Sequence, residues 1–153
     1  MEFTNAWFQG VRPVWEQLLP SFRPARILEI GSYEGQATCW LMQFCSRWHL
    51  LEIHCVGTWE GGVEHHAGGA YEADMAAVEQ RFRRNVEAAA CSLPHGVELR
   101  LRKTLSAEAL VNLLHQAYFD YFDLIDVDGS HLAADVLQDA VLSFRLQICR
   151  FMC

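Results

Sequence analysis

The chain has 153 residues, a length typical of one domain with a sizeable hydrophobic core. Hydrophobic residues make up 52% of it and charged residues 20%, which excludes an intrinsically disordered protein. The formal net charge of −7 argues against nucleic acid or an anionic membrane surface as the main partner. No apolar run is long enough to span a bilayer, so no membrane partner is expected.

The cysteines indicate a reducing compartment. None of them forms a C-x-x-C pair, and no secretory signal precedes them. We expect reduced, mostly buried thiols in a cytoplasmic protein. The six residues are Cys39, Cys45, Cys55, Cys91, Cys149 and Cys153.

Residues 1–25 are rich in aromatic side chains and predict a helical segment that packs on the domain or covers its site. Spacings of three and four place Trp7 and Trp15 on one helical stripe with the aliphatic residues between them. Pro13 predicts a helix that begins near that residue, and Pro20 and Pro24 predict its end.

Residues 26–153 alternate apolar strand patterns with helical patterns. The expected strands are 26–30, 51–56, 97–102 and 121–128. The expected helices are 38–48, 75–89, 106–117 with Ser106 as N-cap, and 136–144. The third strand alternates with charged residues, which places it near a sheet edge. Four strand–helix repeats predict an α/β protein, a Rossmann-like parallel sheet with helices on both faces.

The stretch 26–38 carries the clearest site signal. Glu29 ends the first strand, and Gly31 and Gly35 permit torsions and close approaches that other residues resist. The helix that follows adds a partial positive charge at its N-terminus. This combination suits a nucleoside-bearing ligand with hydroxyls or a cationic end.

Candidate residues follow the other strands as well, and the carboxyl ends of parallel strands meet at one edge of the sheet. Thr58 and Trp59 follow the second strand and Ser106 the third, while Asp128 and His131 follow the fourth. We therefore expect all of them near one ligand site.

A dinucleotide cofactor does not fit this pattern. Its motif is G-x-G-x-x-G with an acid after the second strand. Here Tyr33 takes the place of the middle glycine, and Gly57 stands where the acid is expected. A P-loop motif is absent, so a mononucleoside-type ligand is favoured.

Asp128 and His131 leave several roles open. The carboxylate could orient a substrate hydroxyl, act as a base or hold a divalent cation. Alternatively, Asp128 or Ser130 caps the following helix. His131 is either a base or a structural hydrogen-bonding residue. Adjacent His65 and His66 could bind a metal, but surface residues are the better interpretation, so no metal site is predicted.

Three blocks together resemble a known family. Residues 26–38 look like motif I of the class I S-adenosylmethionine-dependent methyltransferases. Residues 56–62 and 122–131 resemble, within it, the methyltransferase domain 24 group, whose blocks usually read D-T-W-x-G and V/I-D-G-S-H. The resemblance spans roughly 20–148.

The resemblance implies a role for each matching residue. Glu29, Gly31 and Gly35 would line the methionine and ribose portion of S-adenosylmethionine, under a loop formed by Ser32, Tyr33 and Glu34. Thr58 and Trp59 would lie near ribose and adenine, and Ser106 and Ala107 near the adenine ring. Asp128 would face the transferred methyl group, with His131 beside it. In metal-dependent relatives an Asp here binds a divalent cation.

The sequence departs from that family in two places. Gly57 replaces the acid that grips the ribose hydroxyls, a loss of about 1.5–3 kcal/mol, or one to two decades of affinity. Residues 146–153 do not resemble the expected continuation, so 26–153 is interpreted as an incomplete cofactor domain truncated at its C-terminus. An open edge beside the fourth strand would then favour a homodimer.

The predicted function is S-adenosylmethionine-dependent methyl transfer to a small molecule, with a hydroxyl oxygen as the acceptor by analogy. Residues 3–15 and 61–74 are expected to form the acceptor pocket. The alternative is a catalytically inactive, truncated module that serves binding or dimerisation.

Overall fold

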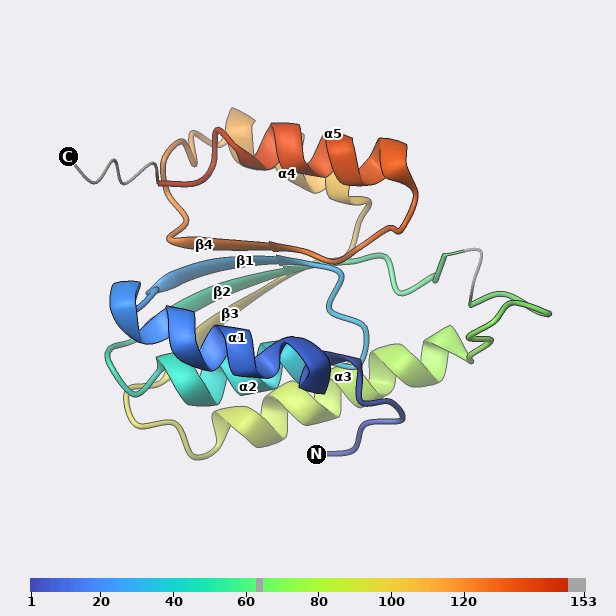
Figure 1. Cartoon of the computed structure of the whole chain (residues 1–153), viewed down its shortest axis with the longest axis horizontal. Coiled ribbons are helices and arrows are strands. Elements are labelled where there is room, and N and C mark those ends of the chain that lie inside the picture. The colour runs from blue at the N-terminus through green and yellow to red at the C-terminus, as the bar shows by residue number, and fades with distance from the viewer. Residues whose placement is uncertain (63–64, 149–153) are drawn as a thin grey trace.

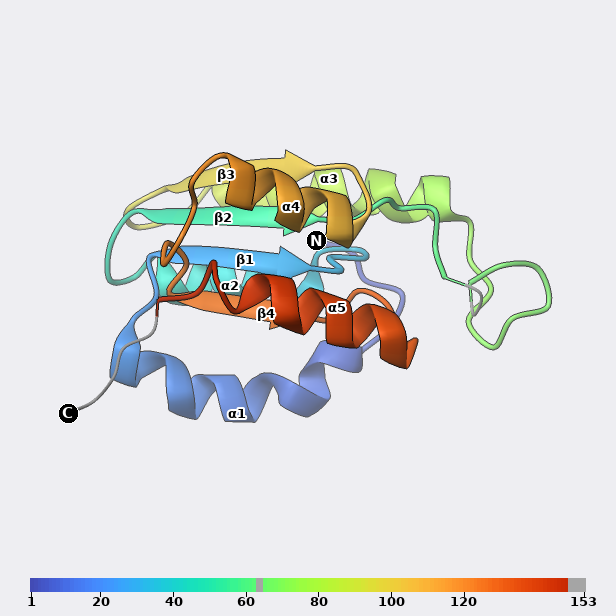
Figure 2. The same cartoon turned by 90° about the horizontal axis from the view of Figure 1, so that it is seen from above.

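Four parallel strands form the central sheet of the structure, a computed structural model that describes residues 1–62 and 65–148. The strands lie in the order β3-β2-β1-β4 (Figure 2), which puts β3 at an edge as predicted. The chain runs outward from β1 to β3 and then returns to the other side of β1, so the strand order reverses between β1 and β4. The strands are β1 (Arg26–Ile30), β2 (Leu51–Val56), β3 (Val97–Arg102) and β4 (Leu124–Val127).

Helices cover both faces of this sheet, which confirms the Rossmann-like α/β fold (Figure 1). One face carries α1 (Trp7–Phe22), α2 (Gln36–Cys45) and α3 (Met75–Ala90). The opposite face carries α4 (Ser106–His115) and α5 (Ala133–Ser143).

Each face has its own hydrophobic core. Side chains alternate between the two faces of a strand, so Ile27 packs with Phe82 under α2 and α3, while Leu28 packs with Leu110 under α4. Cys39, Cys45 and Cys55 are buried free thiols, whereas Cys91 is exposed. Burial raises the pKa of Cys39 and Cys45 to about 12. Cys149 and Cys153 lie outside the described residues.

Helix α1 corrects the prediction made from its prolines. It begins at Trp7, ahead of Pro13, and contains both Pro13 and Pro20. A proline inside a helix removes one backbone hydrogen bond, but most of α1 lies at the surface, where water can satisfy the free carbonyl groups. The buried Phe8 and Leu19 then hold the helix on the domain.

The capping prediction for Ser106 is wrong. Ser106 is the first residue of α4 and not its cap, because Leu105 holds the cap position without a side-chain hydrogen bond. Leu132 holds the cap position of α5, so neither Asp128 nor Ser130 is its N-cap. Ser130 nevertheless accepts a hydrogen bond from the Leu132 backbone N–H at 3.2 Å, and its hydroxyl donates to Asp135 at 2.7 Å.

The fourth strand is shorter than the expected 121–128, because residues 121–123 lie before β4 and are not part of it. Phe122 forms an isolated parallel bridge with Gln147, and Ile148 donates its backbone N–H to Phe122 at 2.9 Å. The chain after α5 therefore returns to the sheet just before β4. The last five residues of the predicted foreign ending, 149–153, lie outside the described residues. Among the residues described, no helix is long and apolar enough to cross a membrane.

Candidate active site at the β1–β4 switch point

Gly31 lets the ends of β1 and β4 come together. Its φ of +94° is a torsion that favours glycine, and its N–H donates to Val56 at 2.9 Å. A Cβ at this position would stand 2.1 Å from the carbonyl oxygen of Asp128. The close approach seen here is made to the backbone that follows β4.

Gly35 has the same kind of role at the start of α2. It has a φ of +79°, and a Cβ there would lie 2.9 Å from the ring of Phe82. Its N–H donates to Ser32 at 2.7 Å, which closes the tight turn before the helix. Both glycines thus fix the shape of the loop 31–35.

Glu29 lies beneath this loop and is 1% exposed. The hydroxyl groups of Ser32 and Thr38 both donate to its Oε2, so the carboxyl group joins the loop to α2. Burial raises the pKa of Glu29, and these hydrogen bonds oppose the shift. Glu29 is absent from the cavity lining described next, so it supports the loop from below.

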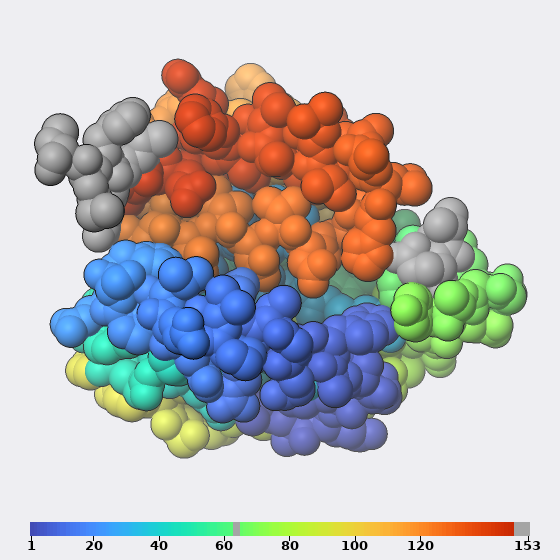
Figure 3. Space-filling view, viewed as in Figure 1, coloured from blue at the N-terminus to red at the C-terminus, as the bar shows by residue number. Residues whose placement is uncertain are grey.

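A cavity of about 390 Å³ lies between the loop 31–35, the end of β4 and the first half of α1. In Figure 3 the blue residues of α1 and the orange residues of β4 and α5 border the same furrow. The lining residues are Asn5, Trp7, Phe8, Val11, Trp15, Gly31, Ser32, Tyr33, Glu34, Gln36, Ala37, Asp126, Val127 and Asp128.

Two aspartates form the acidic side of this cavity. Burial, together with the acidic neighbours Glu29 and Asp128, raises the pKa of Asp126 to about 7. Asp128 is at the mouth, with a side chain that is 74% exposed, and its Oδ1 lies 3.8 Å from Nε2 of His131. His131 is similarly exposed and does not line the cavity.

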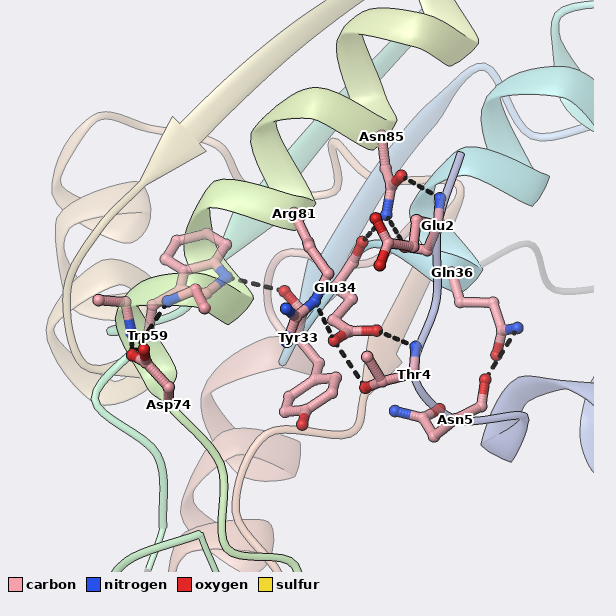
Figure 4. Close-up of polar contacts among 12 residues, drawn as sticks. Glu2, Thr4, Asn5, Tyr33, Glu34, Gln36, Trp59, Asp74, Arg81 and Asn85 are labelled. Carbon is pink, nitrogen blue, oxygen red and sulfur yellow. Dashed lines mark hydrogen bonds and ion pairs between the residues drawn. The ribbon is translucent and has the colours of Figure 1, made fainter.

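An N-terminal arm, residues 2–5, ties α1 to the loop and to α3 (Figure 4). The buried Glu34 accepts hydrogen bonds from the Thr4 backbone at 2.7 Å and the Thr4 hydroxyl at 2.8 Å. Arg81 of α3 donates to the same carboxylate at 2.6 Å. Asn85 donates to the Glu34 carbonyl at 3.0 Å and to the arm at 2.8 Å. Glu34 is therefore fully engaged in holding the cavity wall.

Aromatic side chains gather where α1 meets the loops. The Trp7 ring lies 5.1 Å from Tyr33 and 5.3 Å from Tyr71, measured between centroids. His65 lies 5.4 Å from Tyr33. The segments expected to form an acceptor pocket, 3–15 and 61–74, thus meet beside the cavity in their described parts.

The structure brings only some of the predicted residues to the cavity: Gly31, Ser32, Tyr33, Glu34 and Asp128. Trp59 is 8% exposed, packs on Phe82 and donates its indole N–H to the Tyr33 carbonyl at 2.8 Å, so it belongs to the core. Thr58 accepts a hydrogen bond from the Glu60 backbone at 3.1 Å. Ser106 and Ala107 begin α4 and are also outside the lining.

Sequence reasoning underrated Asp126 and missed Gln36. The two-residue period of a strand places Asp126 on the same face as Asp128, one pleat farther from the open end of β4. The first half of α1 and Asp126 line the same cavity, which leaves this carboxyl group open to it. Gln36 had no sequence signal, because a polar first residue is ordinary in a helix.

A family model for a methyltransferase domain matches residues 28–146, which is most of the chain and includes the switch point. The chain belongs to this family. It is a class I S-adenosylmethionine-dependent methyltransferase by family, as the sequence motifs indicated. No curated protein matches this methyltransferase domain.

The residues of this methyltransferase domain fit the methionine end of S-adenosylmethionine better than its ribose. The cavity adjoins the shaped loop 31–35 and has Asp128 at its mouth, which suits a cationic group. Gly57, at the end of β2, offers no side chain to the ribose hydroxyls. Within residues 1–62 and 65–148, no cluster of three or more His, Cys, Asp or Glu could hold a metal ion.

Proposed function

We propose that this methyltransferase domain transfers the methyl group of S-adenosylmethionine to a small molecule. The observation that carries this proposal is the cavity of about 390 Å³ at the β1–β4 switch point, bordered by the glycine loop and roofed by α1. A site that binds a small molecule between loops at the carboxyl ends of parallel strands is typical of this class of fold.

Each residue at the cavity has a separate task in this proposal. The loop 31–35 would hold the cofactor, whose sulfonium supplies an activated methyl group. Asp128 would face the cationic part of that ligand from the mouth. Trp7 and Tyr33 would exclude water and fix the acceptor in line with the methyl group, because proximity and alignment supply much of the rate in such transfers.

The acceptor and several other details stay predictions. The hydroxyl acceptor rests on analogy alone, as do a divalent cation and a cytoplasmic location. If the methyl acceptor must lose a proton, a base is needed, and Asp128 and His131 are both candidates for it. Support for Asp128 comes from its place in the lining, whereas His131 would have to turn toward the mouth.

Calorimetric titration with S-adenosylmethionine tests this function. We expect binding in the micromolar to millimolar range, and a thermal shift that grows with ligand concentration as mass action requires. Asp128→Asn should weaken binding, while Asp120→Asn, in an exposed loop, should leave it unchanged. The absence of both heat and thermal shift at millimolar ligand would rule out the function.

An inactive binding or dimerisation module is the second candidate, and the edge of β4 favours it. Within the described sheet, β4 pairs with β1 alone, so one row of its backbone groups faces away from the sheet. Light scattering over a range of concentrations tests the predicted homodimer. Backbone groups alternate along a strand, and the Asp123 N–H donates to Arg26 beside β1, so the N–H of Leu124 faces the open edge. Leu124→Pro should then reduce association, and a monomer at all concentrations would exclude the dimer.

A further inference from the structure

The cavity beneath α1 has aromatic side chains on one side and carboxyl groups on the other. Its roof consists of Trp7, Phe8 and Trp15, and its floor carries the carboxyl groups of Asp126 and Asp128. Aromatic faces and carboxylates both attract cations. None of the described residues that line the cavity is a lysine, arginine or histidine.

The negative charge of this floor is largely uncompensated. Glu34 also lines the cavity, but Arg81 already pairs with it at 2.6 Å. For Asp126 the nearby charged groups are Glu29 and Asp128, both acidic. Asp128 has the exposed His131 at 3.8 Å. A cationic ligand would therefore relieve repulsion between the floor carboxylates.

The side chain of Gln36 is a second, independent observation that points to a ligand in the cavity. Its Nε2 donates to the Asn5 carbonyl at 3.5 Å, while its Oε1 is buried and has no hydrogen-bond partner among the described residues. A buried acceptor without a donor costs about 1–3 kcal/mol. Gln36 lines the cavity, so a turn of its side chain would let an N–H group of a ligand there satisfy this oxygen.

We propose that the methyl acceptor is an amine, bound as an ammonium ion over Asp126 and against the indole rings of α1. This inference rests on the proposed methyl transfer and names its substrate class. Asp128, at the mouth, would then face the cofactor, and Asp126, one pleat deeper, would face the acceptor.

The proton and electron pairs balance in this arrangement. The ammonium nitrogen gives one proton to a carboxylate oxygen of Asp126, and its freed lone pair forms the bond to the methyl carbon. The carbon–sulfur bond breaks with its electron pair going to sulfur. Asp126 later releases the proton to water.

Asp126 is better matched to an amine than to an alcohol. Its pKa of about 7 is within a few units of an alkylammonium, which loses its proton at about pH 10. An alcohol holds its proton far more strongly, so a carboxylate is a poor base for it. A base of this strength gives a role to the carboxyl group of Asp126 deep in the cavity.

The proposal is tested by measuring how tightly amines and alcohols bind to the protein loaded with S-adenosylhomocysteine. The probes are used in pairs that differ only in an amino or a hydroxyl group. Phenethylamine is compared with 2-phenylethanol, and tryptamine with tryptophol, by calorimetry at pH 8. We expect each amine to bind at least tenfold more tightly than its alcohol. Binding of the amine should weaken as the pH falls from 8 to 6, because Asp126 becomes protonated.

Asp126→Asn should remove the amine preference and its pH dependence, while Asp120→Asn should keep both. Equal affinity within each pair, or no binding of either amine at 5 mM, would overturn the amine proposal. In that case intact S-adenosylmethionine binding would leave the proposed function standing. Methyl transfer from radiolabelled cofactor to the amines and not the alcohols would complete the support.

Discussion

Glu29 and Asp126 are partners in the register of β1 and β4, and both carboxyl groups lie on the face of the sheet that α1 and α2 cover. Two hydroxyl groups donate to Glu29, whereas burial and the acidic neighbours Glu29 and Asp128 raise the pKa of Asp126 to about 7. Register partners on adjacent strands lie close together, so the two groups repel when both are ionised. This repulsion is a measurable cost to the fold.

Asp126→Asn should stabilise the protein at high pH. The folded pKa of about 7 exceeds the unfolded value of about 3.9, so the folded state binds more protons between these values and loses stability as the pH rises through this window. We expect the variant to gain up to about 4 kcal/mol at pH 8, from about three pKa units at 1.36 kcal/mol each, and almost nothing near pH 4. Urea unfolding at several pH values measures this, and a gain independent of pH would contradict it.

Arg81→Ala should destabilise the fold much more than Arg83→Ala. The Arg81 partner Glu34 is 1% exposed and would keep an uncompensated charge, a loss of about 3 kcal/mol. Arg83 pairs with Glu79 at an exposed site of the same helix, where such pairs contribute less than about 1 kcal/mol. Denaturant unfolding of both variants compares them, and similar losses would show that Glu34 does not depend on Arg81.

Gly57→Asp should strengthen binding of S-adenosylmethionine by about tenfold, the lower end of the value of a charge-assisted hydrogen bond. The site accepts a side chain, because a Cβ there would lie 3.7 Å from the Trp59 ring, an ordinary contact. Ser92→Asp, in the exposed turn after α3, adds the same charge elsewhere as a control. Calorimetry measures both, and equal affinities would argue against a ribose contact at position 57.

Gly31→Ala should be far more damaging than Gly68→Ala. Both glycines have left-handed torsions, with φ of +94° and +82°. A Cβ at Gly68 meets nothing within 4 Å, so that variant should lose only about 1 kcal/mol from torsional strain. At Gly31 the Cβ would collide with the Asp128 backbone and part β1 from β4. Thermal unfolding compares them, and equal losses would mean that the strand ends can separate without cost.

The sequence by itself determined the order of strands and helices. Both faces of the sheet are covered, so the inner strands 26–30 and 51–56 are short, mostly apolar runs, whereas the edge strand 97–102 alternates. The boundaries of these three strands could be read directly. The glycine torsions at 31 and 35 also followed from local chemistry, because only glycine adopts them without strain. The motifs that follow the first, second and fourth strands then indicated the family.

Only the tertiary structure decided which of these residues meet. Trp59 follows its strand as expected, yet it turns into the core because Phe82 and the Tyr33 carbonyl offer it contacts from other elements. Asp126 lines the cavity because α1 leaves space above it, and Glu34 is engaged by an arm 30 residues earlier in the chain. Such contacts join distant segments, and a local pattern carries no information about the partner that packing brings to it.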